Sequence, residues 1–318
     1  MQGEVERTFS DELARNFRNY CPVPGVESDD VYKNRWLTVP GGQAREVPFC
    51  PRRGQAREVR RGVLKRAVLA KTPFCPRRGQ ALVGIRFKGL DLARPFVTVA
   101  ATTWAVESAA DSSRLAISLK QEYALFAPLH VRLFVPAGVS IDMNALPPGS
   151  EWEKRFLAAP VTDLLARSRP ENYERVILRA PDDLDFYPRY VEEYEALFAA
   201  HPEHREFARV EYEEDLSEYR EEGLLFEVLI DGEWAGVVAV TRAEEEGLNG
   251  FVVVEMFLDA AHRGRGLGPA VQRHLTERLP AGKGDVLYGT IHDRNHAAVR
   301  AAERSGRQDI GAYLWVEV

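Results

Sequence analysis

The sequence predicts an α+β fold for the second half of the chain, with a mixed, mostly antiparallel central sheet flanked by helices. Short apolar runs of strand length alternate there with amphipathic stretches of helical period, across residues 173–318. Two of these runs, 224–230 and 234–241, are separated by Asp231 and Gly232, a dipeptide typical of a two-residue hairpin turn. The chain of 318 residues is 45% hydrophobic and can bury two cores, so we expect two domains.

The expected elements of the second half follow the order strand, helix, helix, three-strand meander, helix, strand, helix, strand. Their ranges are 173–179, 183–200, 212–222, 224–230, 234–241, 251–258, 269–279, 286–291, 295–304 and 313–318. A loop at 242–249 is expected between the last two strands of the meander. These elements make up the predicted carboxy-terminal domain, 173–318.

The first half, residues 1–168, is predicted to form an α/β domain. Apolar patterning indicates strands and helices that include a strand–helix–strand unit. The strands are placed at 83–87, 95–102 and 130–136, and the helices at 111–126 and 151–167. The polar, proline-bearing stretch 168–172 follows, and we expect the domain boundary there.

A nine-residue stretch, 48–56, recurs at 73–81 with a period of 25 residues. The copies are rich in proline and arginine and lack an apolar face, so stacked repeats are not expected. We interpret 41–82 as an inserted basic loop within the first domain. Between Arg52 and Lys88 the chain carries 12 lysines or arginines and one acidic residue. Because this stretch has no recognisable nucleic-acid motif or interleaved aromatic residues, nucleic-acid binding is a weaker reading.

Composition excludes several other classes of protein. No apolar run approaches the length of a membrane span, and the first residues are acidic and polar, so we expect a cytoplasmic protein without membrane association. The three cysteines, Cys21, Cys50 and Cys75, have neither disulfide nor metal-ligand spacing, so free thiols and no metal are expected. The charge is uneven, about +9 over 1–170 and about −15 over 171–318.

The strongest motif is a glycine-rich loop between the apolar run 251–258 and the helix expected from 269. Its residues are Arg263, Gly264, Arg265, Gly266, Leu267 and Gly268. A glycine turn that opens directly into a helix points backbone N–H groups at an anion, at the positive end of the helix dipole. A dinucleotide site would place such a loop after the first strand of a βαβ unit, whereas a meander precedes it here. The loop is therefore predicted to bind phosphate in another type of fold.

The spacing R-x-x-G-x-G, after an apolar strand and before an amphipathic helix, is similar to the acyl-CoA pyrophosphate motif of the GNAT N-acetyltransferase superfamily. The second half resembles this superfamily over about 145 residues, in the order of its elements as well as in the loop. The resemblance implies acetyl-CoA as co-substrate and a splay between the strands at 252–258 and 286–291. It also implies that the backbone of Met256, Phe257 and Leu258 binds the pantetheine arm, and that Asn295 lies near that arm. A helix N-cap is the structural alternative for Asn295.

Acetyl transfer to an amine needs a group that accepts the amine proton. Glu255, in the apolar strand before the loop, and His292, after the next strand, are the two candidate bases, and a purely structural role stays open for each. The resemblance places a tyrosine acid seven residues after Asn295, where this chain has Ala302. Water, Tyr288 or Tyr313 would then protonate the leaving thiolate, or the domain would bind acyl-CoA with little turnover.

Acidic residues gather on the first two predicted helices of the second half and their loop. They are Asp182, Asp183, Asp185, Glu192, Glu193, Glu195, Glu211, Glu213, Glu214 and Asp215. Such a field would attract a cationic amine of a small molecule or peptide, and a solvated acidic face is the alternative. The first half resembles a degenerate copy of the same fold that lacks a glycine loop. The oligomeric state stays open, with a homodimer as one option. An acyl-CoA-binding regulatory or interaction module is the alternative to an N-acetyltransferase.

Overall fold

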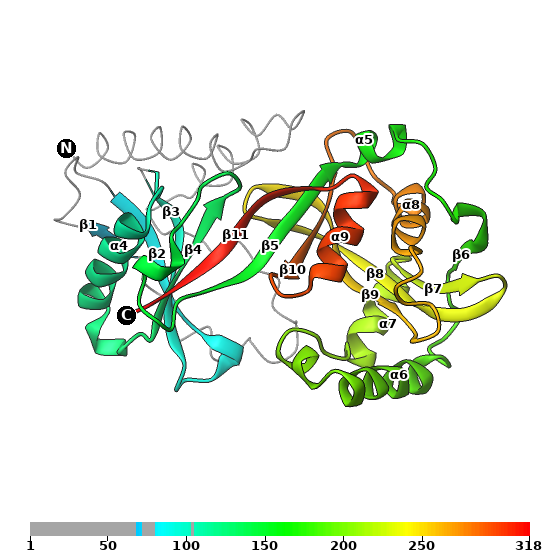
Figure 1. Cartoon of the computed structure of the whole chain (residues 1–318), viewed down its shortest axis with the longest axis horizontal. Coiled ribbons are helices and arrows are strands. Elements are labelled where there is room, and N and C mark those ends of the chain that lie inside the picture. The colour runs from blue at the N-terminus through cyan, green and yellow to red at the C-terminus, as the bar shows by residue number, and fades with distance from the viewer. Residues whose placement is uncertain (1–67, 72–79, 103–104) are drawn as a thin grey trace. The chain divides into compact units, whose positions relative to one another are not determined.

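The computed structural model describes residues 68–71, 80–102 and 105–318 (Figure 1). The described residues fall into two compact units. Residues up to 155, together with 310–318, belong to the first unit, and residues 156–309 form the second. The strands β5 (Glu151–Pro160) and β11 (Gln308–Glu317) each have residues in both units. The predicted bounds 1–168 and 173–318 stay an expectation.

The first unit is built from β-strands with one long helix. Its strands lie in the order β1-β2-β3-β4-β11. Besides β11, its elements are β1 (Val68–Lys71), β2 (Gln80–Phe87), β3 (Pro95–Thr102), α4 (Ala109–Glu122), β4 (His130–Pro136) and three short 3-10 turns, Lys88–Leu90, Ala124–Phe126 and Met143–Ala145. β3 and β4 pair in parallel, with α4 as the connection, whereas β1 with β2, β2 with β3, and β4 with β11 pair antiparallel. The predicted strand–helix–strand unit is confirmed.

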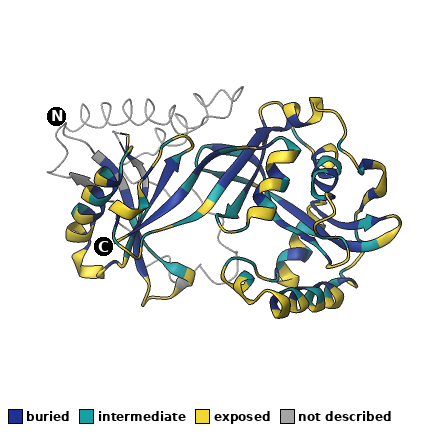
Figure 2. Cartoon of the chain, viewed as in Figure 1, coloured by how far each residue is buried: buried dark blue, intermediate teal, exposed yellow. Residues whose placement is uncertain are grey.

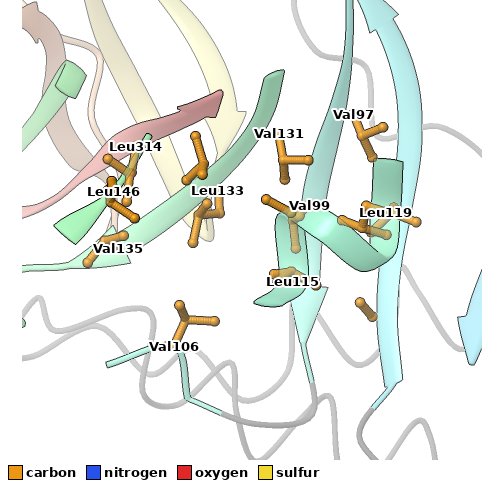
Figure 3. Close-up of a cluster of buried hydrophobic side chains, with 14 of the residues drawn as sticks. Val97, Val99, Val106, Leu115, Leu119, Val131, Leu133, Val135, Leu146 and Leu314 are labelled. Atoms are coloured by element: carbon orange, nitrogen blue, oxygen red, sulfur yellow. The ribbon is translucent and has the colours of Figure 1, made fainter. Parts of the chain in front are cut away.

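The core of the first unit lies between α4 and the sheet. Side chains at alternate positions of β3 and β4 meet one face of the helix, as Figure 3 shows for Val97, Val99, Leu115, Leu119 and Val131. Leu119 and Val131 are fully buried. This spacing of apolar residues in the strands and the helix is what made these elements predictable.

Two predictions for the first half are wrong. The helix expected at 151–167 is the strand β5 followed by the short helix α5 (Val161–Ala166). Pro160 lacks the N–H that a helix interior needs, and Phe156–Pro160 are buried one after another, as suits a strand covered on both faces. The segment 41–82 is not wholly a loop, because 68–71 and 80–82 pair as β1 and β2. Its remaining residues, and the three cysteines, lie outside the described residues.

The second unit contains one sheet with helices on both sides. Its strands lie in the order β5-β10-β9-β8-β7-β6. The remaining elements are Tyr173–Arg175 (a 3-10 turn), β6 (Val176–Arg179), α6 (Tyr187–Ala200), Pro202–Glu206 (3-10), α7 (Glu213–Glu221), β7 (Leu225–Ile230), β8 (Glu233–Glu245), β9 (Leu248–Leu258), α8 (Gly268–Arg278), β10 (Val286–His292) and α9 (His296–Ser305). β6 to β9 pair antiparallel and β9 pairs with β10 in parallel. The α+β class with a mostly antiparallel sheet is confirmed.

Each face of this sheet has its own core. In Figure 1, α6 and α7 lie along one side of β8 and β9, and α8 and α9 along the other. Aromatic residues of α6, such as Tyr190 and Phe198, pack on Val237 and Phe257 of the sheet. On the opposite face Val271 and Leu275 of α8 pack into a second cluster. Figure 2 shows the strands buried between exposed outer helix surfaces, with α6 as a clear example.

Two tight turns connect the meander. Asp231 and Gly232 both have positive φ, 53° and 92°, as the predicted hairpin turn requires. The second connection is shorter than expected, because β8 continues to Glu245 and β9 begins at Leu248. The turn consists of Glu246 and Gly247, again with positive φ. The loop expected at 242–249 is therefore wrong, because 242–245 belong to β8 and 248–249 to β9.

Candidate active site

The strands β9 and β10 form a wedge. Their parallel pairing runs from Gly250 opposite Val286 to Val253 opposite Gly289, whereas both strands continue beyond this last pair. Gly250 permits the close start of the wedge, because a Cβ there would lie 2.1 Å from the Val286 carbonyl oxygen. Beyond the pair of Val253 and Gly289, the edge of β9 that faces β10 no longer pairs with that strand. This is the splay expected between the two strands.

A β-bulge decides which side chains face each side of the wedge. Ala239 of β8 pairs with Glu255, and the next residue pairs with Val253, so Val254 is the extra residue. Val254 and Glu255 therefore both face α6, whereas Val253 and Met256 pack towards α8. The bulge directs Glu255 into the α6 face just before the segment expected to hold the cofactor.

The glycine loop follows β9 directly, and Asp259 anchors it. The buried Asp259 accepts hydrogen bonds at its carbonyl oxygen from the backbone N–H groups of His262 and Arg263, and its carboxylate accepts from the His262 N–H at 3.1 Å. The His262 ring lies 2.7 Å from the same carboxylate oxygen. These contacts hold the start of the loop while its glycines remain exposed.

The glycines shape the loop for an anion. Gly264 and Gly266 have φ values of 73° and 74°, a conformation that favours glycine. The described backbone hydrogen bonds stop at the Arg263 N–H and resume at the Val271 N–H, which donates to the Leu267 carbonyl. The intervening N–H groups are oriented by a turn that leads into the positive end of the α8 dipole. This arrangement fits a pyrophosphate.

The end of the loop packs closely on the wedge. A Cβ at Gly268 would lie 3.1 Å from the Cβ of Ala301 in α9 and 3.5 Å from the Met256 methyl carbon. Gly268 therefore brings α8, α9 and β9 together at one place. The start of α4 in the first unit differs, because the Ser108 hydroxyl already accepts the Asp111 N–H and Asp111 adds negative charge.

The side chains of the two arginines of the loop, Arg263 and Arg265, fold back onto nearby backbone carbonyl groups. The Arg263 Nε donates to the Leu258 carbonyl at 2.5 Å, and its guanidinium lies over the Phe257 ring. Burial lowers the pKa of Arg263. Arg265 is exposed and donates to the Ala261 carbonyl at 3.2 Å. Arg263 therefore braces the end of β9, while Arg265 remains at the surface of the loop.

Glu255 lies in a polar cluster inside the α6 face. Its carboxylate accepts from the Tyr190 hydroxyl at 2.5 Å, from the Tyr194 hydroxyl at 3.1 Å and from the Met256 N–H at 2.7 Å. The Tyr190 hydroxyl in turn accepts from the Glu211 N–H at 3.1 Å. The Met256 N–H, expected to bind the pantetheine arm, thus has a protein partner in this structure.

The protein tunes the acidity of Glu255. Burial raises its pKa to about 7, against the hydrogen bonds from Tyr190 and Tyr194, while the nearby Glu211 adds to the rise. A carboxyl with this pKa exchanges its proton near neutrality, which is the useful range for a general base. Burial and Glu255 together raise the pKa of both tyrosine hydroxyls, so they stay protonated donors.

The other expected site residues lie around the end of β10. His292 ends this strand, its Nδ1 accepts from the Arg294 N–H at 3.2 Å, and its ring stacks on Phe207 with centroids 5.2 Å apart. The Asn295 side chain caps α9 by accepting the Ala298 N–H at 3.2 Å. The N-cap role of Asn295 is therefore present.

The position expected for a tyrosine acid has an apolar environment. Ala302 is fully buried and packs with Leu157 and Val299. Of the alternative hydroxyls, Tyr288 is buried in β10, and Tyr313 lies in the first unit. Position 302 itself therefore carries no hydroxyl.

Sequence reasoning missed three side chains of this region, namely Tyr190, Tyr194 and Arg307. The tyrosines recur four residues apart on α6, a spacing that indicated an apolar helix face and concealed their hydroxyl contacts. Arg307 lies in the short connection between α9 and β11. Its burial depends on the packing of α8, α9 and β10.

The wedge between β9 and β10, the glycine loop at the start of α8 and the buried Glu255 lie in one α+β domain. Residues 185–306 match the model of the acetyltransferase (GNAT) family. This part of the chain is a domain of that family. Comparison with curated proteins gives no match to the chain.

Several solved structures are similar to this chain at low identity. One is a GNAT acetyltransferase from Colwellia psychrerythraea, with 13% identity, a TM-score of 0.45 and coverage of 65% of this chain and 72% of that one. Another is a GCN5-related N-acetyltransferase from Sphaerobacter thermophilus, with 16% identity, a TM-score of 0.42 and coverage of 74% and 75%. A tandem GNAT protein from the clavulanic acid biosynthesis pathway has 11% identity, a TM-score of 0.39 and coverage of 75% and 78%.

Within 68–71, 80–102 and 105–318, no group of three or more histidine, cysteine, aspartate or glutamate side chains is placed to hold a metal ion. No helix in the same ranges has the length and apolar character needed to cross a membrane.

Proposed function

We propose that the second unit is an acetyl-CoA-dependent N-acetyltransferase that transfers an acetyl group to a primary amine in a ternary complex. The observation that carries the proposal is the glycine loop, whose backbone N–H groups lie free at the start of α8 beside the open edge of β9. Gly264 to Gly268 would hold the pyrophosphate, and the β9 edge at Phe257 and Leu258 would bind the pantetheine arm as an added strand.

In this proposal the chain supplies binding, orientation and proton transfer, and acetyl-CoA supplies the activated acyl group. Glu255 accepts the amine proton through water, because its carboxyl is ionised for a large part of the time near its pKa of about 7. Tyr190 and Tyr194 hold the carboxylate in place. His292, at the end of β10, is the alternative base.

The loop is tested by Gly266→Glu, with Gly223→Glu as a matched control. Both glycines have positive φ, 74° and 72°, and open space around the Cβ position, so both variants carry similar strain and the same added charge. Only the Gly266 variant places a carboxylate against the pyrophosphate. We expect it to abolish acetyl-CoA binding in calorimetry and the control to bind like wild type. Equal affinity for acetyl-CoA in all three proteins would refute the proposal that the glycine loop binds the pyrophosphate.

The alternative function is an acyl-CoA-binding regulatory or interaction module, favoured by the apolar surroundings of Ala302. A thiol-detection assay with a panel of amines separates the two. Release of CoA that depends on an amine supports the enzyme, whereas tight acetyl-CoA binding without release supports the module.

A cationic amine is the acceptor class that we propose. Several acidic residues of α6, α7 and the segments before them are exposed, such as Asp183 and Glu213. Others are already paired, Glu195 with Arg205 for example, at 2.6 Å. The exposed carboxylates would attract positive charge. Polyamines and basic peptides should therefore react faster than neutral amines at low salt, and a preference for neutral or anionic acceptors would contradict this.

For the first unit we propose a supporting role as a degenerate copy of the same fold. Its β3-α4-β4 unit repeats the strand, helix and parallel strand of β9-α8-β10. The start of α4, however, is capped by Ser108 and carries Asp111. A phosphate would meet a satisfied N–H and a negative charge there, so we expect one bound acetyl-CoA per chain in calorimetry.

A further inference from the structure

Arg307 is a buried cation without an anionic partner. Arg307 comes directly before β11 in the chain, and only 4% of its surface is exposed. Nη2 donates to the Gln272 Oε1 at 2.8 Å, whereas Nε and Nη1 are buried and have no hydrogen-bond partner. Burial lowers the pKa of Arg307 to about 10, so the guanidinium keeps its charge at neutral pH. In the described part of the chain no carboxylate pairs with it.

The guanidinium lies at the apex of the wedge. A Cβ placed on Gly289 would be 2.7 Å from the Arg307 Nη1 and 3.7 Å from the Val253 Cβ. Gly289 and Val253 are the last pair of the parallel ladder between β10 and β9. Nη1 therefore occupies the space that a side chain at Gly289 would fill, on the face of the wedge where α8 and α9 pack.

This place matches the reactive end of the bound cofactor in the proposed function. From Val253 to Leu258, β9 spans about 16 Å at the usual rise per residue. An extended pantetheine arm that starts from a pyrophosphate at the glycine loop and follows this edge would bring its sulfur atom towards the apex. A buried charge without a partner is strongly disfavoured, so an anion that forms there would be stabilised.

We propose that Arg307 stabilises the CoA thiolate that leaves during acyl transfer, an inference that rests on the proposed function. The amine nitrogen attacks the thioester carbonyl carbon, the carbon–sulfur bond breaks, and its electron pair remains on sulfur. The amine proton goes to Glu255, through water, and from there to solvent. Arg307 keeps its own protons and pairs with the thiolate until water protonates it. This cation compensates for the absence of a hydroxyl at Ala302.

The test measures the thiol pKa of bound CoA. CoA enriched with carbon-13 at the carbon next to sulfur is titrated by NMR, free and bound to saturating full-length protein, after calorimetry has measured its affinity. On the wild type we expect a thiol pKa at least one unit below that of free CoA, about a tenfold gain in thiolate, because an opposite charge nearby favours the ionised form.

Two variants remove the effect by different routes. Arg307→Met deletes the charge, and Gly289→Ala keeps the arginine while its new methyl group displaces the guanidinium. The clash in the second variant is with the mobile end of a side chain, so the fold should tolerate it. In both variants the thiol pKa should return to that of free CoA. Gly282→Ala is the matched control, since its Cβ would have only one ordinary contact, at 3.8 Å from Asp285.

Each outcome decides the matter. The same lowered thiol pKa in wild type, Arg307→Met and Gly289→Ala would overturn the role of Arg307 and leave the acetyltransferase proposal standing. Folded variants that all lose CoA binding, Arg307→Lys included, would show that Arg307 only shapes the site, and this too would overturn it. Absence of CoA binding to the wild type would refute the proposed function itself. If Arg307→Met fails to fold, Gly289→Ala carries the test.

Discussion

Replacement of Glu255 by glutamine should change how the stability of the second unit depends on pH. Glutamine has nearly the same shape, and its amide oxygen can still accept from the Met256 N–H and from Tyr190. It cannot ionise. The variant therefore removes one titrating group from the α6 face and leaves most of the packing in place.

The sign and size of the effect follow from the pKa of Glu255. The folded-state value is about 7, above the value of 4.5 that applies without burial. The folded protein thus holds the proton more tightly than the unfolded chain. The resulting stabilisation is fully present below about pH 4.5 and is lost as the pH rises through about 7. The difference between these folded-state and unfolded-state pKa values corresponds to about 3 kcal/mol in the free energy of unfolding.

Urea unfolding of both proteins at several pH values between 5 and 8.5 measures this effect. Wild type should lose about 2.5 kcal/mol more than Glu255→Gln across that range, so the variant is relatively more stable at high pH. Glu227→Gln is the control, since it removes a carboxylate of similar burial that pairs with Arg179 at 2.8 Å. The control should still lose stability as the pH rises, because it retains Glu255. Parallel stability curves for wild type and Glu255→Gln would refute the reasoning.

Two further substitutions test the wedge and the tyrosine cluster. Gly250→Ala places a methyl group 2.1 Å from the Val286 carbonyl oxygen, where only backbone could yield, so we expect a loss of at least about 2 kcal/mol in urea unfolding. Gly282→Ala, measured beside it, should stay close to wild type, and equal midpoints for the two would contradict the close approach. Tyr190→Phe removes a hydrogen bond that lowers the pKa of Glu255, so its acid–base transition should move to higher pH, with a loss of about 1–3 kcal/mol at pH 8. NMR of the Glu255 carboxyl carbon measures this transition. If the transition lies at the same pH in wild type and Tyr190→Phe, the prediction is contradicted.

Much of the second unit was predictable because its local signals agree with its tertiary role. The Asp231-Gly232 turn, the helix before Leu279 and the glycine loop each follow from local backbone preference or from helical period. The prediction failed at 151–167, where a helical rhythm coincides with a strand that packs on both faces. Burial on both faces comes from neighbours distant in sequence, so no local pattern contains it.

For the second half, the sequence by itself determined the order of the elements, the α+β class and the position of the glycine loop, Arg263 to Gly268, before a helix. Backbone conformation and apolar periodicity are local properties, and the loop needs only glycines at the start of a helix. Only the tertiary structure decided that Glu255 faces two tyrosines of α6 and that Arg307 reaches the apex of the wedge beside Gly289. The charge state of a buried group depends on all the atoms around it, and those atoms come together only when the chain folds.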